Sequence, residues 1–148
     1  EDEIATAIVS LMEKQKVVAE GAAATTVAAC LFNKLPIKGL KTVCVISGGN
    51  IDLNILSRVI TRGMVTSGRQ SNLTIALEDK PGQLAQISEI ICKTGANIHY
   101  VNHDRADANM PITSCFLKLY LETRNWEQVE EVRNALTEAG YQIVKERV

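Results

Sequence analysis

Two short segments of this 148-residue sequence carry residue types that could bind a small molecule. The first is Ser47-Gly48-Gly49-Asn50, in which a hydroxyl lies beside two glycines. A serine hydroxyl is a neutral hydrogen-bond partner, and glycine lets the backbone approach a flat ligand closely. Either the glycines only turn the chain, or the segment is half of a site whose remainder lies elsewhere.

The second segment is EDKPGQLAQI, residues 78–87. Asp79 and Pro81 are typical of a helix start, and Gly82 has no side chain to block approach to the backbone. The amides of a first helical turn lack partners within the helix and attract a carboxylate. We expect Asn97, at the start of the next strand, to lie nearby. An ordinary strand-to-helix turn is the alternative.

Two other kinds of site are less well supported. His99 and His103 could share a metal ion on a helix, but on a strand this spacing spans roughly 13 Å, so no metal site is predicted. RNA recognition would need basic residues around exposed aromatics. Phe116 and Tyr120 lack that pattern, and the net charge is -1, so nucleic-acid binding is not expected.

Composition indicates a globular protein, with 46% hydrophobic and 22% charged residues. No apolar run approaches the roughly 20 residues that a membrane span needs. The four cysteines lie far apart without a Cys-x-x-Cys pair, which favours small apolar residues in a reducing cytoplasm. The chain opens at Glu1 without a methionine, so we expect an internal start.

The first part of the chain, residues 1–66, reads as an α/β fragment. Helical periodicity is present over residues 2–12, an alanine-rich helix follows from Val17 and ends before Pro36, and another helix follows Asn50. Residues 41–47, KTVCVIS, predict a strand that is buried on both faces. One such strand cannot form a sheet, so these residues are interpreted as the last elements of a larger domain. Residues 67–71 are predicted to be a linker.

The second part, residues 72–148, has a more regular pattern. Leu73, Ile75 and Leu77 alternate as in a strand, and a helix with one apolar face follows. Further strands are predicted at residues 98–105 and 111–122, then a helix that ends at Gly140 and a last strand. The order βαββαβ predicts an α+β, ferredoxin-like fold with an antiparallel sheet and both helices on one face.

Residues 71–148 resemble the ACT domain, a regulatory module of amino-acid metabolism. The resemblance is carried by Asp79-Lys80-Pro81-Gly82-Gln83-Leu84 and by Gly95-Ala96-Asn97-Ile98. It implies that two modules pair side by side and that an amino-acid effector binds at their interface. The implied effector-binding residues are listed here: Asp79, Gly82, Gln83, Leu84, Asn97 and Ile98.

Residues 17–52 resemble the C-terminal end of the catalytic domain in fold-type II pyridoxal-phosphate lyases and racemases, the family of threonine dehydratases (threonine ammonia-lyases). The resemblance implies that Ser47 lies beside the pyridine nitrogen of pyridoxal 5'-phosphate, with Gly48 and Gly49 below the ring and Glu20 near it. The family's Ser-x-Lys and tetraglycine motifs have no match here, so the chain is not expected to hold the cofactor covalently or to be active alone.

Together the resemblances imply the C-terminal part of a cytoplasmic threonine dehydratase that carries one ACT domain. The implied substrates are L-threonine and, as an additional substrate, L-serine. The implied partners are the missing N-terminal catalytic portion, a second ACT domain in a homo-oligomer, and isoleucine or valine as effector. An independent amino-acid-binding regulator and a purely structural dimerisation module are the alternatives.

Overall fold

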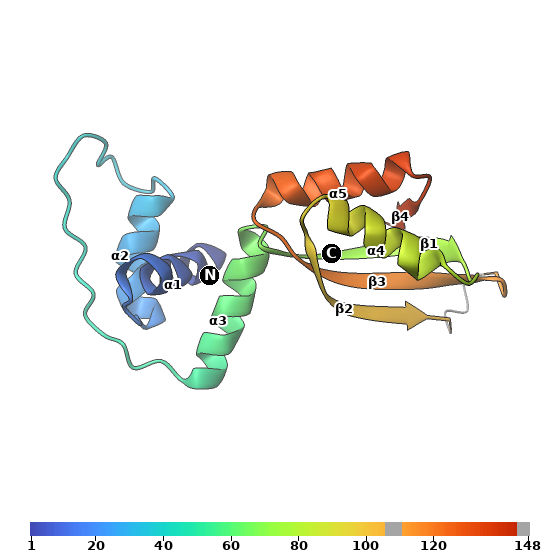
Figure 1. The fold of residues 1–148 in the computed structure, drawn as a ribbon. Helices are drawn as coiled ribbons and strands as arrows, with labels where there is room; N and C mark the ends of the chain where they lie inside the picture. The colour runs from blue at the N-terminus through green and yellow to red at the C-terminus, as the bar shows by residue number, and fades with distance from the viewer. Residues whose placement is uncertain (106–110, 145–148) are drawn as a thin grey trace. The chain divides into compact units, whose positions relative to one another are not determined.

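The computed structural model describes residues 1–105 and 111–144 and divides into two compact units, residues 1–67 and 68–148. Figure 1 labels their helices and strands. Among the described residues, no helix is long and apolar enough to cross a membrane. Each unit has its own cluster of buried side chains, so each is described separately.

The first unit consists of helices α1 (Asp2–Gln15), α2 (Gly21–Leu31) and α3 (Leu53–Thr66). Helix α3 begins where the Asp52 carboxylate accepts hydrogen bonds from two backbone amides of the first turn. The three helices correspond to the predicted ones, although α2 begins at Gly21, four residues later than the sequence pattern indicated.

Small side chains form the core of the first unit, as the alanine-rich sequence predicted. The buried residues of this cluster are Ala7, Ile8, Leu11, Ala19, Ala23, Ala24 and Ala28. A Cβ built on Gly63 of α3 would lie 2.6 Å from Cγ2 of Val9, so α3 approaches α1 at van der Waals distance here. Little side-chain volume separates these helices, which limits how much apolar surface the unit buries.

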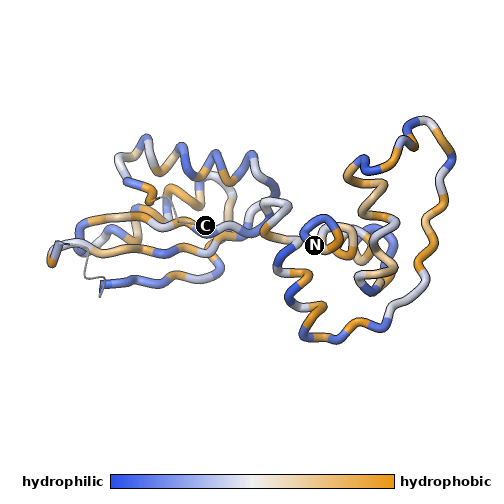
Figure 2. The backbone as a smooth tube through the Cα atoms, turned by 180° about the vertical axis from the view of Figure 1, so that it is seen from behind, coloured by the Kyte–Doolittle hydropathy of each residue, from blue (hydrophilic) through white to orange (hydrophobic). Residues whose placement is uncertain are grey.

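The predicted strand at residues 41–47 is absent from the structure. This stretch has no regular secondary structure, and Val43 and Val45 are 88% and 68% exposed. Figure 2 shows the apolar character of this extended segment. The physical reason is that a strand needs neighbouring strands for its backbone hydrogen bonds, and residues 1–67, all described, contain none.

The second unit has the predicted βαββαβ order. Its elements are β1 (Gln70–Glu78), α4 (Gln83–Lys93), β2 (Asn97–Asp104), β3 (Ser114–Glu122), α5 (Trp126–Glu138) and β4 (Gln142–Val144). The sheet order is β2-β3-β1-β4, with every adjacent pair antiparallel. Both helices cover the same face of the sheet (Figure 1). The prediction of a ferredoxin-like, ACT-like fold is therefore confirmed.

The core of the second unit lies between that sheet face and the helices. Strand β3 buries every second residue, because alternate side chains of a strand point to the same face. These residues are Cys115, Leu117, Leu119 and Leu121. Gln128 of α5 is also buried, where its side chain donates to the Thr94 carbonyl and accepts from the Arg124 amide. The polar group is thereby satisfied inside the core.

The connection between the units is shorter than the predicted linker at residues 67–71. Gln70 and Ser71 already belong to β1, so the linker prediction is wrong for these two residues. Thr123, just after β3, donates from its hydroxyl to the Gly68 carbonyl at 2.6 Å, and its amide donates to the Arg69 carbonyl. Pairing with β3 thus extends β1 by polar residues that precede its apolar ones.

Candidate functional site

A tight turn joins β1 to α4 in the second unit. The Asp79 amide donates to the Thr113 carbonyl at 2.9 Å, which fixes the turn to the residue before β3. Gly82 has φ 90°, a conformation that L-residues rarely adopt, and it forms the N-cap of α4. The helix thus begins at Gln83; the predicted start at Pro81 is wrong because Pro81 and Gly82 form the turn.

The turn borders a cavity of about 310 Å³, within the range of about 300–1,000 Å³ that is typical of small-molecule pockets. The lining residues come from the turn, the start of α4 and three strands. They are Leu77, Asp79, Lys80, Pro81, Gly82, Gln83, Leu84, His103, Arg105 and Leu117. Four predicted effector-binding residues, Asp79, Gly82, Gln83 and Leu84, are therefore brought together around one cavity.

Charged groups face one another at one side of this cavity. Arg105 donates from Nε to Oδ2 of Asp79 at 2.5 Å and from a terminal nitrogen to Oδ1 at 3.1 Å. This bidentate bond holds the pKa of the Asp79 carboxyl below its usual range. Asp79, which was expected to cap the helix, instead forms an ion pair across the end of the sheet.

Gln83 contributes a polar atom that is not satisfied within the described part of the chain. Its Oε1 is shielded from solvent and accepts no hydrogen bond from any described residue. A buried acceptor without a donor costs about 1–3 kcal/mol. The Gln83 side chain also lines the cavity, so a ligand that presents an N–H group there would satisfy this acceptor once the side chain rotates toward it.

Asn97 and Ile98 lie at the opposite end of the sheet. Strand β1 reaches Glu78 opposite Ser114, whereas Asn97 pairs with Glu122 at the other end of β3. Eight residues of strand separate these ends, roughly 27 Å. The expectation that Asn97 lies near the turn of its own chain is thus wrong. The side-chain Nδ2 of Asn97 instead donates to the Glu122 carboxylate at 3.0 Å.

The Ser-Gly-Gly segment of the first unit lies against the residues before α2. The Glu20 amide donates to the Gly48 carbonyl at 3.1 Å, and a Cβ on Gly48 would lie 2.7 Å from the Glu20 carboxylate. A Cβ on Gly49 would lie 2.7 Å from the backbone oxygen of Val18. The glycines are therefore needed for space, and the exposed Ser47 is brought within the same small region as Glu20.

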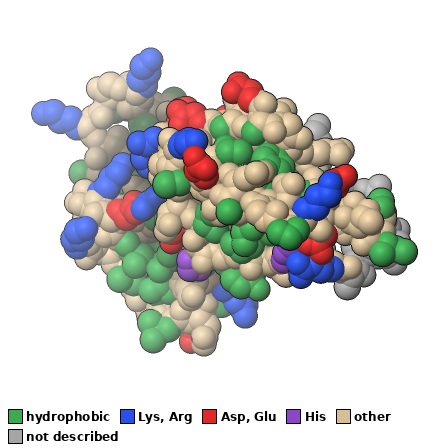
Figure 3. Space-filling model, turned by 45° about the vertical axis from the view of Figure 1, so that its right-hand side comes forward, with side chains coloured by type: hydrophobic (Ala, Val, Ile, Leu, Met, Phe, Trp, Pro, Cys, Tyr) green, Lys and Arg blue, Asp and Glu red, His purple; other side chains and the backbone are tan. Residues whose placement is uncertain are grey.

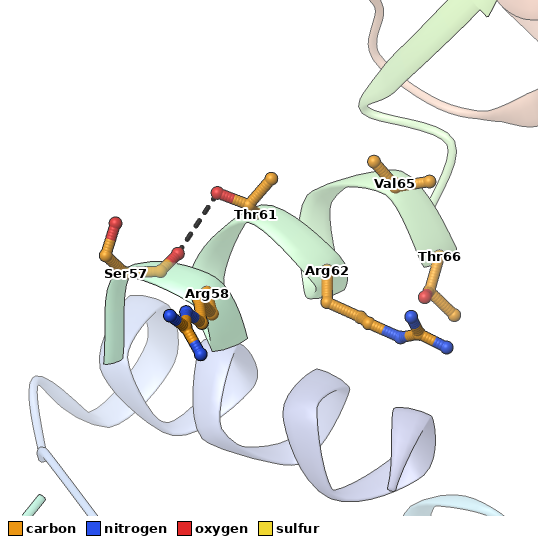
Figure 4. A pocket seen from close by; sticks show the side chains of 6 residues that line it. All are labelled: Ser57, Arg58, Thr61, Arg62, Val65 and Thr66. Carbon is orange, nitrogen blue, oxygen red and sulfur yellow. Dashed lines mark hydrogen bonds between the residues drawn. The ribbon is translucent and has the colours of Figure 1, made fainter. Parts of the chain in front are cut away.

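Two further hollows occur in the first unit. One, of about 630 Å³, is lined by residues that include Glu20, Gly21 and Asn50; of the predicted cofactor residues it borders Glu20, whereas Ser47, Gly48 and Gly49 do not line it. The other is lined by α3 side chains, among them Arg58 and Arg62, and is shown in Figure 4. Its six lining residues come from a single helix, so no second element converges with them on a ligand. We assign no site to it.

Sequence reasoning missed three residues near the turn. His103, Arg105 and Cys115 approach Asp79 only through the pairing of β2 with β3 and of β3 with β1. Local spacing carried no signal for these contacts. His99 and His103 have different partners: His99 lies 3.7 Å from Glu122, whereas Nε2 of His103 lies 2.9 Å from Sγ of Cys115.

Charges of both signs are scattered over the face of the molecule in Figure 3, among hydrophobic patches. This mixed surface agrees with the net charge of -1.

Comparison with known proteins gives relatives over almost the whole chain. The chain is 46% identical over 143 residues to an L-threonine ammonia-lyase of Thermotoga maritima, covering 97% of this chain and 35% of that protein. It is 43% identical over 141 residues to an L-threonine ammonia-lyase of Geobacter sulfurreducens, covering 95% of this chain and 35% of the relative. The chain thus spans about a third of the length of these relatives.

Among solved structures, the ACT domain of a prephenate dehydrogenase from Bacillus anthracis matches with 22% identity and a TM-score of 0.38, covering 50% of this chain and 100% of that domain. No protein-family model matches the chain. The two relatives match at 43–46% identity over 95–97% of this chain. The chain is thus related, along nearly its whole length, to the C-terminal part of L-threonine ammonia-lyases, as its motifs predicted.

Proposed function

We propose that the chain is the C-terminal part of a pyridoxal-phosphate-dependent threonine ammonia-lyase, and that its second unit is an ACT domain which binds an amino-acid effector. The parent protein would convert L-threonine to 2-oxobutanoate and ammonia, with L-serine as a second substrate. The observation that carries this proposal is the 46% identity over 97% of the chain.

Residues 1–67 would form one side of the cofactor site. The exposed Ser47 would hydrogen-bond to the pyridine nitrogen, the Gly48-Gly49 backbone would lie below the ring, and Glu20 would lie beside it. When bound, the cofactor supplies an electron sink for cleavage of the substrate Cα–H bond. A neutral hydroxyl at the ring nitrogen makes that sink weaker than a carboxylate would, which suits elimination of a good leaving group.

The exposed apolar side chains of the first unit support this interpretation. Val43, Val45 and Leu53 are 88%, 68% and 78% exposed, more than a self-sufficient core would leave in water. We propose that the N-terminal catalytic portion covers them and pairs with residues 41–47 as a strand. The four free thiols agree with a reducing, cytoplasmic environment.

The cavity beside the turn supports an aliphatic amino acid as the effector. Its amino group would donate to the buried Oε1 of Gln83, and its carboxylate would bind the first-turn amides of α4. Leu77, Leu84 and Leu117 would contact a branched side chain, which agrees with isoleucine or valine. Asn97 and Ile98 would come from the second chain of an ACT pair, since in their own chain they lie at the far end of the sheet.

Effector binding would act on the catalytic unit through the connection that precedes β1. We propose that it changes the packing of the paired ACT domains, and that residues 67–69 pass the strain to α3. The two hydrogen bonds from Thr123 to Gly68 and Arg69 would couple this connection to the end of β3. Helix α3 in turn begins shortly after the Ser47 segment.

Calorimetric titration of the chain with each of the twenty amino acids tests the effector proposal. Heat is expected with isoleucine or valine. Replacing Gln83 by Met removes the acceptor at similar volume and should weaken binding by about 1.5–3 kcal/mol, roughly 10- to 150-fold. Gln142→Met, at an exposed position of β4, is the matched control and should leave affinity unchanged. No heat with any amino acid would instead favour a structural dimerisation module.

The cofactor proposal has a separate test in the full-length protein. Ser47→Ala should weaken retention of pyridoxal phosphate and lower turnover while effector binding stays normal. Unchanged turnover and unchanged cofactor retention would contradict the role assigned to Ser47. Normal lyase activity without any effector response would leave this role intact and remove only the regulatory proposal.

A further inference from the structure

Three potential metal ligands converge at one end of the sheet in the second unit. His103 of β2 lies opposite Leu117 of β3, so its side chain shares a face with Cys115, two residues away on β3. Cys115 pairs with Leu77 of β1, and Asp79 follows directly after that strand. Neighbouring strands therefore bring together an imidazole, a thiol and a carboxylate that are distant in the sequence.

The donor atoms point at one another. Nε2 of His103 lies 2.9 Å from Sγ of Cys115 and 3.6 Å from Oδ1 of Asp79. All three donor atoms lie within 4.8 Å of one another. The same ring nitrogen faces both partners, so in the neutral tautomer that carries its proton on Nδ1 the Nε2 lone pair is directed at the space between the thiol and the carboxylate.

This arrangement differs from a catalytic cysteine triad. In such a triad the imidazole uses one nitrogen for the nucleophile and the other for the carboxylate. Here Nδ1 faces neither partner in the described contacts. The cluster is therefore built as a ligand set and not as a nucleophile.

We propose that Asp79, His103 and Cys115 bind one zinc-class divalent metal ion. In tetrahedral zinc sites, bond lengths of about 2.0–2.3 Å place neighbouring donor atoms about 3.3–3.6 Å apart. The observed donor–donor separations, from 2.9 Å to at most 4.8 Å, lie on both sides of this range. Side-chain shifts of roughly 1 Å at most would therefore reach the tetrahedral geometry. The inference rests on neither the effector nor the cofactor proposal, although the ion would border the proposed effector cavity.

Charge balance and the surroundings agree with such an ion. On binding, the thiol proton is released to solvent, and the thiolate and the Asp79 carboxylate offset the divalent charge, while Arg105 keeps its own positive charge beside Oδ2. Arg105 would keep its Nε hydrogen bond to Oδ2, whereas its terminal nitrogen would give up the 3.1 Å bond to Oδ1 as that oxygen turns to the ion. Asp79 and His103 also line the cavity, so the fourth coordination position would face it and hold water.

Cobalt(II) binding to the intact chain provides the test, because a cobalt–thiolate bond gives a near-ultraviolet charge-transfer band. The other thiols are removed first by the substitutions Cys30→Ser, Cys44→Ser and Cys92→Ser. This matters because Cys30 and Cys44 lie 3.4 Å apart and could bind the probe themselves. In this background we expect one cobalt ion per chain and a thiolate band from Cys115, both abolished by excess Zn²⁺.

Two histidine variants then separate the proposed site from general surface binding. His103→Gln should weaken cobalt binding at least tenfold, whereas His99→Gln, on the same strand, should leave it unchanged. His103 is partly exposed, so its replacement is compatible with folding, which circular dichroism verifies. Absence of a thiolate band in the triple-serine background would overturn the proposal. Equal affinity in the two histidine variants would also overturn it.

Discussion

Replacing Gly82 by Ala should affect both the stability of the second unit and its effector binding. Gly82 has φ 90°, and a Cβ there would meet no atom within 4 Å. The cost to stability is therefore conformational and not steric, about 1–2 kcal/mol for an L-residue in the left-handed region. For a domain of this size that corresponds to a fall in melting temperature of roughly 4–16 °C. Because Gly82 lines the cavity, the new methyl group should also take up space that the proposed effector would occupy.

Gly140→Ala is a matched control in the same unit. Gly140 has φ 89° and an equally open Cβ position, but it follows α5 and does not line the cavity. Urea unfolding should give similar losses of stability for the two variants. Calorimetry should show weaker effector binding, by roughly tenfold or about 1.4 kcal/mol, only for Gly82→Ala. Equal affinities in both variants, or no loss of stability in Gly82→Ala, would refute the reasoning.

Two further predictions concern close contacts in the structure. Gly49→Ala should destabilise the first unit more than Gly48→Ala. The Gly49 Cβ would meet a backbone oxygen, which cannot move freely, whereas the Glu20 carboxylate beside Gly48 can move away. Equal urea midpoints for the two variants would contradict this prediction. Arg105→Gln should raise the pKa of the Asp79 carboxyl in an NMR titration. In the native chain the lowered pKa of Asp79 stabilises the fold at pH values above the pKa of this carboxyl in the unfolded chain. That contribution is lost as the pH falls through the pKa of Asp79 in the folded chain. An unchanged Asp79 pKa in the variant would count against the ion pair.

Local patterns predicted most of the second unit. Strands β1 and β3 alternate apolar and polar residues, and the two helices carry one apolar face each, so their positions follow from periodicity. The predicted order of elements then left few topologies, and the observed sheet is the expected one. The predicted end of the linker was wrong because Gln70 and Ser71 belong to β1, where they pair with β3. Composition alone does not reveal this pairing.

Contacts between distant residues could not be predicted in the same way. The apolar run at residues 41–47 predicted a strand, yet a strand forms only where partner strands exist. Asn97 was placed near the turn from its position at a strand start, but β1 and β2 run in the same direction, so the end of one is far from the start of the other. The Asp79–Arg105 ion pair depends on strand register, which the sequence alone does not specify.

The most direct test of the effector site uses two variants, each of which should fail to bind the effector when it is the only chain present. Gly82→Leu blocks the turn, and Asn97→Ala removes the strand residue that the second chain would supply. In a symmetric pair each site takes its turn from one chain and its strand from the other. After the variants are mixed and allowed to exchange, one site of each mixed pair is intact, so calorimetry should recover about a quarter of the wild-type sites at wild-type affinity. A mixture that binds no effector, although mixed pairs form and wild-type chains bind it, would contradict the account.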